Sequence, residues 1–384
     1  MTKKDTASQF SLLLLFFLLV LPQGIFCASL PPSIQEMLKT LKLDPSILAD
    51  TDKELQVPKD WIEKAKKESK LRILGAGFEP GLVKAFFAPF KERYPFIEIE
   101  YSSPGHEARS VKFLTAYKGG RILADALTSI GGTFYQFKQA NALEDLRNIP
   151  NWKNVPEGAK DPDGLWVGFE ILYWCVAYNT KLVKKEELPK RWEDLLTNPR
   201  WRGGNLALGN RPQLWALNLW KAKGENWTKD FLTRLFAELK PQLRKEDLRA
   251  QLQLVAAGEF HLVIPEAGTM VYKAALTGAP IGFTCPEPLP VAAEEAVIVK
   301  GAPGANAARV LLNWWLSKEG QVAQYSALKY APVHKDLQRS EFIPFADQIL
   351  GKEISYRDPA LELDVMPKLE EFWGNLWLRG GRGK

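Results

Sequence analysis

The sequence predicts an α/β protein built from two lobes, and three observations lead to this prediction. The chain has 384 residues, and a single hydrophobic core usually divides beyond about 250–300 residues. Its composition, 46% hydrophobic and 25% charged, is typical of a folded protein rather than a disordered one. Strand-like segments alternate with helical ones along the chain, which favours α/β layers with mostly parallel strand pairing.

The first strand–helix–strand unit lies near the start of the folded body. Residues 71–74 are a short apolar strand that runs into a glycine-bearing turn. Residues 81–94 carry apolar side chains three and four positions apart, which indicates a helix. Residues 96–101 alternate between apolar and polar side chains, as a strand does. Together these segments predict a β-α-β unit.

The same pattern continues along the chain. Further strands are expected at residues 124–130, 166–178, 205–208, 261–264 and 296–299, with helices at residues 229–239 and 247–257. Near the end, residues 308–315 place their apolar side chains on one helical face. The alternation of strands and helices therefore covers most of the chain.

The N-terminus has the features of a secretory signal peptide. A basic start precedes an apolar run over residues 11–21, and small residues follow near Cys27. The run is shorter than the ~20 residues that span a membrane, so residues 1–28 are expected to be a cleaved signal. The mature protein is then soluble and exported, to the periplasm or the cell exterior. Lipid attachment at Cys27 is less favoured, because Phe26 stands where a small residue is usual.

Composition excludes several classes of function. The 51 Lys and Arg residues against 45 Asp and Glu give a net charge of +6, a mild bias that falls short of a nucleic-acid-binding signature. Three cysteines and three scattered histidines are too few for a disulfide scaffold or a histidine-rich metal site, and no cofactor is expected. In an oxidising compartment, Cys175 and Cys285 either pair or remain as small core residues.

The glycine-rich loop at residues 75–81 invites a nucleotide-binding interpretation. It follows a strand and opens a helix, but its pattern G-x-G-x-x-x-G is one residue longer than the dinucleotide fingerprint. Binding of NAD also conflicts with export. The loop is better interpreted as a turn at the carboxyl end of a strand, where open α/β sheets bind ligands. Gly77 and Phe78 are therefore candidate binding residues.

No common enzymatic motif is present. The sequence contains no H-E-x-x-H, G-x-S-x-G, G-x-x-x-x-G-K-[ST] or C-x-x-C pattern. Glu294 and Glu295 point to opposite faces of an extended chain, so they cannot act as a carboxylate dyad, and we interpret them as surface charge. His106 lies on a polar loop, where it is either solvated or close to a ligand. The absences favour a binding protein, with a secreted two-lobed α/β hydrolase as the alternative.

Four polar strand ends, spread over both halves of the chain, predict one binding cleft between two lobes. The candidate ligand-binding residues are Gly77, Phe78, Thr133, Phe134, Asn210, Arg211, Glu266, Thr269 and Tyr272. Amides at a helix start beside Arg211 suit a carboxylate or phosphate. The alternative at that position is a helix capped by Asn210 with a solvated arginine.

Five stretches over most of the mature chain share the order and character of a known family. They are residues 61–68, 176–183, 188–203, 296–302 and 316–321. These stretches resemble the extracellular solute-binding proteins of bacterial ABC importers, and more narrowly the branch that contains the ferric-iron-binding proteins. The stretch LPKRWEDLLTNPRWRG is similar to the family's entry into the second lobe.

The resemblance implies a type II periplasmic-binding-protein fold, in which a two-strand hinge joins two α/β lobes and the ligand cleft lies between them. The implied division is a signal peptide at residues 1–28, a lead-in with an amphipathic helix at 29–69, a first lobe from 70–168 and 288–384, and a second lobe at 169–287. The implied function is capture of a small ligand (an anion, a polar organic solute or ferric iron) by lobe closure. A monomeric receptor would then deliver the ligand to a membrane permease.

One departure from the ferric branch concerns the metal ligands. Ferric members hold iron with an adjacent tyrosine pair in the second lobe, near the segment that here covers residues 265–272. This segment has only Tyr272, and no Tyr-Tyr pair occurs in the chain. If iron is bound, the resemblance points to Tyr272, Glu266 and His106. An anion or polar organic solute held by Thr133, Arg211 and helix amides is the favoured ligand.

Overall fold

The computed structural model describes residues 30–76, 78 and 80–381. The expected signal peptide, with Cys27, lies outside the described residues, as does Gly77. No helix in the described part of the chain has the length and apolar character to cross a membrane.

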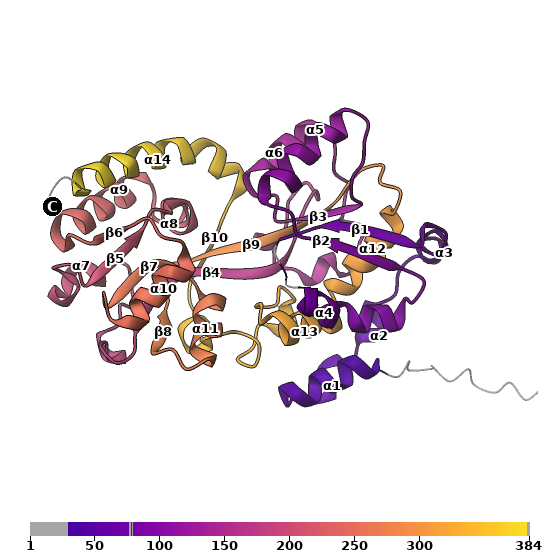
Figure 1. Cartoon of the computed structure of the whole chain (residues 1–384), viewed down its shortest axis with the longest axis horizontal. Coiled ribbons are helices and arrows are strands. Elements are labelled where there is room, and N and C mark those ends of the chain that lie inside the picture. Colours follow the sequence, from indigo (N-terminus) through magenta and orange to yellow (C-terminus); the bar gives the residue numbers. More distant parts are fainter. Residues whose placement is uncertain (1–29, 77, 79, 382–384) are drawn as a thin grey trace, which may run out of the picture.

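Ten strands form one continuous sheet that runs through the molecule (Figure 1). The strands are β1 (Lys70–Leu74), β2 (Glu98–Ser102), β3 (Ala126–Thr128), β4 (Val167–Asn179), β5 (Leu206–Gly209), β6 (Gln242–Arg244), β7 (Leu262–Ala267), β8 (Ile281–Thr284), β9 (Leu289–Ile298) and β10 (Ile354–Tyr356). Their main order is β2-β1-β3-β9-β4-β7-β5-β6, with β10 beside β9 and β8 beside β4. Pairing is parallel among β1, β2 and β3 and among β5, β6 and β7, as the alternation of strands and helices predicts.

The helices cover this sheet in two groups, one at each end (Figure 1). They are α1 (Pro32–Leu41), α2 (Thr51–Glu54), α3 (Lys59–Glu68), α4 (Pro80–Arg93), α5 (Phe113–Lys118), α6 (Phe134–Gln139), α7 (Asp194–Thr197), α8 (Ala216–Lys223), α9 (Glu225–Arg234), α10 (Leu248–Ala257), α11 (Gly268–Leu276), α12 (Ala305–Trp315), α13 (Lys318–Leu328) and α14 (Pro359–Gly381). Two short 3-10 turns, η3 (Gly131–Thr133) and η8 (Pro212–Leu214), follow strand ends that matter for the site.

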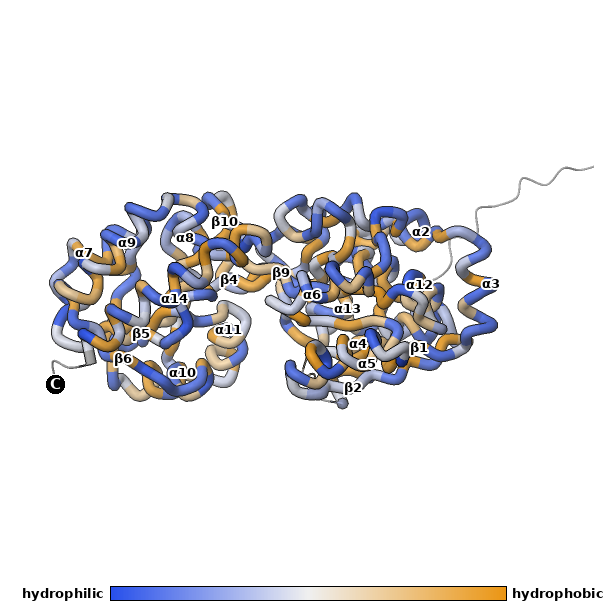
Figure 2. Tube along the Cα trace, turned by 90° about the horizontal axis from the view of Figure 1, so that it is seen from above, coloured by the Kyte–Doolittle hydropathy of each residue, from blue (hydrophilic) through white to orange (hydrophobic). Residues whose placement is uncertain are grey.

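The two long strands β4 and β9 connect the halves. The end of β9 pairs antiparallel with β3, its middle and start pair with β4, and the end of β4 pairs with β7 and β8. Both strands therefore run from one half into the other, and they lie between the two halves when the molecule is viewed from above (Figure 2). The predicted two α/β lobes with a two-strand hinge are confirmed.

Strand β9 is longer than the sequence indicates. The apolar pattern predicts a strand only at residues 296–299, whereas β9 begins at Leu289. Its middle is Ala-Ala-Glu-Glu, which lacks the apolar side chains of a buried strand. Pairing with β4 over this stretch supplies the backbone hydrogen bonds that hold it extended.

The lead-in, residues 30–69 of the described chain, forms part of the first half. Two of its carboxylates accept hydrogen bonds from backbone amides at the starts of first-half helices. The Glu68 carboxylate accepts hydrogen bonds from the Asn306 and Ala307 amides at the start of α12, at 3.3 and 2.8 Å. The Glu54 carboxylate accepts the Lys318 amide at the start of α13, at 2.8 Å. The first amides of a helix have no partner within the helix and carry partial positive charge, so both contacts are stabilising.

The C-terminal helix α14 packs on the second half, whereas the sequence-based division places all of residues 288–384 in the first lobe. Leu369 and Trp373 are buried in the core of the second half, and the Trp373 ring lies edge-on to Trp215 at 6.3 Å. The Trp373 Nε1 donates to Asn210 Oδ1 at 2.8 Å. Helical spacing identifies the apolar face of α14 but carries no information about which core it covers.

Of the two alternatives for the cysteines, the structure has the disulfide. Cys175 on β4 is bonded to Cys285, just after β8, with 5.0 Å between the Cα atoms. Both residues are fully buried. The disulfide therefore joins the second-lobe end of β4 to the segment that returns toward β9.

Candidate functional site

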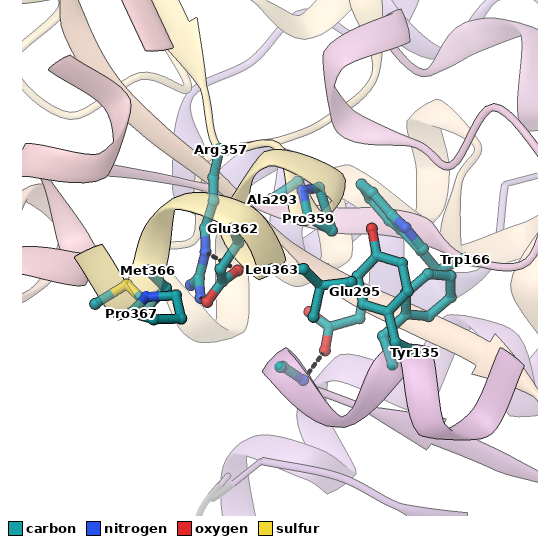
Figure 3. A pocket seen from close by; sticks show the side chains of 13 residues that line it. Tyr135, Trp166, Ala293, Glu295, Arg357, Pro359, Glu362, Leu363, Met366 and Pro367 are labelled. Carbon is teal, nitrogen blue, oxygen red and sulfur yellow. Dashed lines mark hydrogen bonds and ion pairs between the residues drawn. The ribbon is translucent and has the colours of Figure 1, made fainter. Parts of the chain in front are cut away.

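Ligand-binding loops of open α/β sheets follow the carboxyl ends of parallel strands. One such loop, the turn η3 after β3, forms a cavity of about 280 Å³ together with the hinge and the start of α14. That volume is close to the lower end of the roughly 300–1,000 Å³ usual for small-molecule sites. Figure 3 shows Tyr135 and Trp166 on one side of the cavity and residues of α14 on the other.

Glu295 on β9 supplies a carboxylate to this cavity. It accepts a hydrogen bond from the Gly131 amide, drawn as a dashed line in Figure 3. Gly131 has φ +55°, a left-handed conformation that glycine adopts at little cost. Burial, together with the charge of the neighbouring Glu294, raises the pKa of Glu295 to about 7. The interpretation of Glu295 as surface charge is therefore wrong.

The other charged groups of the cavity pair with each other at the start of α14. The Arg357 guanidinium donates through Nε to Glu362 Oε2 at 2.9 Å, and its Nη2 pairs with Glu362 Oε1. The Arg357 amide also donates to the Val291 carbonyl of β9, at 2.7 Å. A two-pronged guanidinium–carboxylate pair of this kind is strong and directional, so it holds the start of α14 against the hinge.

The opposite face of the hinge carries a second pair of carboxylates. Glu294 is in register with Glu170 of β4, and burial together with the Glu294 charge raises the pKa of Glu170 well above its usual range. Phe78, a predicted site residue, lies on this side of the fold. Its ring is 5.3 Å from Tyr101 and 5.8 Å from Tyr330, and the side chain is buried. Phe78 thus packs against its own lobe.

Two predicted residues at the η3 turn have different roles. Phe134 lines the cavity and is buried. Thr133 donates its Oγ1 hydroxyl to the Ile130 carbonyl at 2.6 Å, within its own turn. Among the eight predicted ligand-binding residues that the structure describes, Phe134 is the one that lines this cavity.

In the second lobe, the predicted pair Asn210 and Arg211 is engaged by the protein. Asn210 accepts from Trp373 of α14, and η8 begins without a side-chain cap, so the capping alternative does not hold. Arg211 donates through Nη1 to the Glu246 carbonyl at 3.0 Å. It also lines an open hollow with Asp247 and Met270. Whether Arg211 binds an anion stays a prediction.

The predicted residues of the β7–α11 segment are largely buried. Glu266 has no exposed surface, and neither carboxylate oxygen has a side-chain partner in the described structure. Burial raises the pKa of Glu266 to about 9, although the Arg211 charge opposes this shift. The carboxyl group is therefore neutral near pH 7. Thr269 is buried in the first turn of α11, and the Tyr272 ring lies 5.9 Å from Phe345.

The three residues expected to hold iron have separate surroundings in the described structure. His106 lies in the first lobe, with its Nε2 3.1 Å from the Ile130 carbonyl and its Nδ1 3.3 Å from Ser110 Oγ. Glu266 is enclosed in the second lobe, and Tyr272 packs on Phe345. The ferric donor set stays a prediction, and lobe movement would have to assemble it.

A different group of potential metal ligands occurs in the first lobe. Glu54, His334 and Asp336 have ligand atoms within 4.8 Å of one another. The His334 Nδ1, however, accepts the Asp336 amide at 3.1 Å, and its Nε2 faces Glu54 Oε1 at 3.3 Å. Lys318 lies 3.6 Å from the same carboxylate. Nδ1 is thus occupied by the Asp336 amide, and the Glu54 carboxylate lies between His334 and Lys318, so this cluster fastens the lead-in to the lobe.

Sequence reasoning missed the cavity residues on the hinge and on α14. A signal existed for Glu295, because the alternation of side chains along a strand places it opposite Glu294. Arg357 and Glu362 gave no such signal, since a salt bridge five residues apart near a helix start looks like ordinary surface charge. These two residues line the cavity only because of where α14 packs, which the sequence pattern does not show.

Comparison with known proteins places the chain in a family. Residues 111–348 match the family model described as bacterial extracellular solute-binding protein. Iron uptake protein A1 of Synechocystis sp. is 28% identical over 155 residues, which are 38% of this chain and 41% of the relative. The chain thus spans about two fifths of the length of the curated relatives it matches.

Solved structures share the fold over a larger part of the chain. Iron-bound HitA from Pseudomonas aeruginosa has a TM-score of 0.63 at 21% identity, covering 79% of this chain and 99% of that one. Trichodesmium FutA in complex with iron and citrate has a TM-score of 0.66 at 15% identity, covering 80% and 99%. The type II periplasmic-binding-protein fold is thereby confirmed. From the family match and the two-lobed fold, we conclude that this chain belongs to the bacterial extracellular solute-binding proteins.

Proposed function

We propose that this protein is the exported receptor of an ABC importer, a monomer that captures a small ligand between its lobes and delivers it to a membrane permease. One observation carries the proposal. The cavity has walls from the first lobe, at Phe134 and Glu295, and from α14, whose Trp373 is anchored in the second lobe. A ligand in the cavity therefore contacts groups attached to both lobes.

Closure follows from this arrangement as a population shift. A ligand that contacts both lobes binds the closed form more tightly than the open form, and only such a difference in affinity can move the equilibrium. The hinge strands β4 and β9, and the link from β10 to the start of α14, are the connections that have to bend. For the lobes themselves, we propose residues 70–168 with 288–358 as the first, and 169–287 with α14 as the second.

Ferric iron is a second candidate ligand. It is supported by the relatives named as iron uptake proteins and by the iron-bound structures with the same fold. The residues available for it are Tyr272, Glu266 and His106. Because His106 and Tyr272 contact other residues and Glu266 is fully buried in the described structure, iron binding requires a larger rearrangement than filling the existing cavity.

A ligand panel on the mature protein tests the receptor function. The panel contains Fe³⁺ with and without citrate, phosphate, phosphonates, sulfate, polyamines and small carboxylates. A true ligand raises the melting temperature by linkage, with about 2.7 kcal/mol of added stability at one hundred times its Kd. The same ligand is expected to reduce the radius of gyration in small-angle X-ray scattering. Turnover of a substrate without any stabilising solute would favour the secreted hydrolase instead.

A further inference from the structure

The charges of the cavity do not cancel. Glu295, Arg357 and Glu362 are the charged residues among its described lining. Arg357 directs both prongs of its guanidinium to Glu362, so these two charges neutralise each other. The Glu295 carboxylate accepts the Gly131 amide and has no side-chain hydrogen bond from the described residues. The cavity consequently has one excess negative charge when Glu295 is ionised.

The walls around this carboxylate are aromatic and aliphatic. The Phe134 and Tyr135 rings lie edge-to-face at 5.3 Å, and Trp166 is on the same side of the cavity (Figure 3). Opposite them, Leu363 of α14 is 52% exposed at the cavity rim. Aromatic faces attract cations, whereas a molecule that covers Leu363 removes apolar surface from water.

We propose that this cavity binds a small organic cation, an ammonium group on an apolar body, with the ammonium against Glu295 and the body between Tyr135 and Leu363. The inference rests on the proposed receptor function and specifies its ligand class. An anion does not suit the cavity, because Arg357 is already paired and Glu295 would repel it. A hard metal ion does not suit it either, because Glu295 is the one carboxylate of the described lining that no arginine hydrogen-bonds.

Three matched probes test the ligand class in the full mature chain. 2-Phenylethylamine, 2-phenylethanol and 3-phenylpropanoate share an aromatic body and differ in charge. Titration calorimetry is expected to give the tightest binding for the amine and at least tenfold weaker binding for the carboxylate. Equal binding of the amine and the carboxylate, or no binding of the amine at millimolar concentration, would overturn the proposal.

Two neighbouring substitutions on β9 locate the binding group. Glu295→Gln is expected to weaken the binding of 2-phenylethylamine at least tenfold and to leave the affinity for 2-phenylethanol unchanged. The substitution deletes the negative charge and keeps the shape of the side chain. Glu294→Gln makes the same charge change on the opposite face of the strand and should leave the preference for the amine intact. Loss of that preference in both variants would indicate a general charge effect and contradict the assignment to Glu295.

A separate readout distinguishes failure of this inference from failure of the receptor function. If a solute of the panel closes the lobes in small-angle scattering but the amine does not bind, the receptor function holds and the ligand class is wrong. If the amine binds through Glu295 without any change in the radius of gyration, the cavity site holds and the closure mechanism is wrong.

Discussion

The two lobes place polar residues at equivalent strand ends, yet they use them differently. In the first lobe, the turn after β3 leaves Phe134 and the Gly131–Glu295 pair facing a cavity. In the second lobe, Asn210 and Arg211 hydrogen-bond to other residues of the protein, and Glu266 is enclosed with no side-chain partner among the described residues. A polar strand end is thus a ligand site only where the fold leaves its groups unused. The second lobe contributes through α14 rather than through its own loops.

The largest expected effect comes from removing Trp373, the side chain that anchors α14 in the second lobe. Trp373→Ala removes a buried indole from the second-lobe core, and such truncations cost about 3–5 kcal/mol. The measurement is the free energy of unfolding in urea, together with affinity for 2-phenylethylamine, which should fall because the cavity wall loosens. Asn375→Ala, exposed on the same helix, is the control. A loss within about 0.5 kcal/mol for Trp373→Ala, the range of surface changes, would show that α14 is not held there.

The next expected effect is a pH dependence of the free energy of unfolding, which comes from Glu266 in the second lobe. Burial raises the pKa of Glu266 from its ordinary 4.5 to about 9. The native state therefore keeps a proton that the unfolded chain releases between these values. Stability from this group is complete below about pH 4.5 and is lost as the pH rises toward 9, with a slope of up to ~1.4 kcal/mol per pH unit.

Glu266→Gln removes this dependence, because the amide stays neutral at every pH. We expect the variant to gain stability relative to the parent between pH 5 and pH 8, measured by urea unfolding at each pH. The exposed Glu259→Gln is the matched control and should show no such gain. A constant difference between Glu266→Gln and the parent across this range would mean that Glu266 is ionised in the native protein.

Local patterns were sufficient to predict most of the helices and strands, whereas the two-strand hinge was predicted from the family resemblance, since the apolar pattern covers only the end of β9. The helix at 81–94 and the strand at 166–178 follow from apolar spacing, and the structure has them as α4 and β4 within a residue or two. The cavity was harder to predict. Its residues Glu295 and Glu362 are separated by a long segment, and they meet only because α14 crosses back over the hinge. Contacts of that kind depend on tertiary packing, which periodicity does not encode.

The substitution Arg211→Ala has the smallest expected effect on ligand affinity. It also compares the hinge cavity directly with the site predicted from the sequence. The Arg211 guanidinium donates to the Glu246 carbonyl and is absent from the cavity lining. Arg211→Ala should therefore change the affinity for 2-phenylethylamine less than twofold, about 0.4 kcal/mol. The sequence alone predicts the opposite role, in which the arginine holds an anion. A tenfold loss of affinity for any anion of the panel would make Arg211 a ligand residue and move the binding site from the hinge cavity to the second lobe's own strand ends.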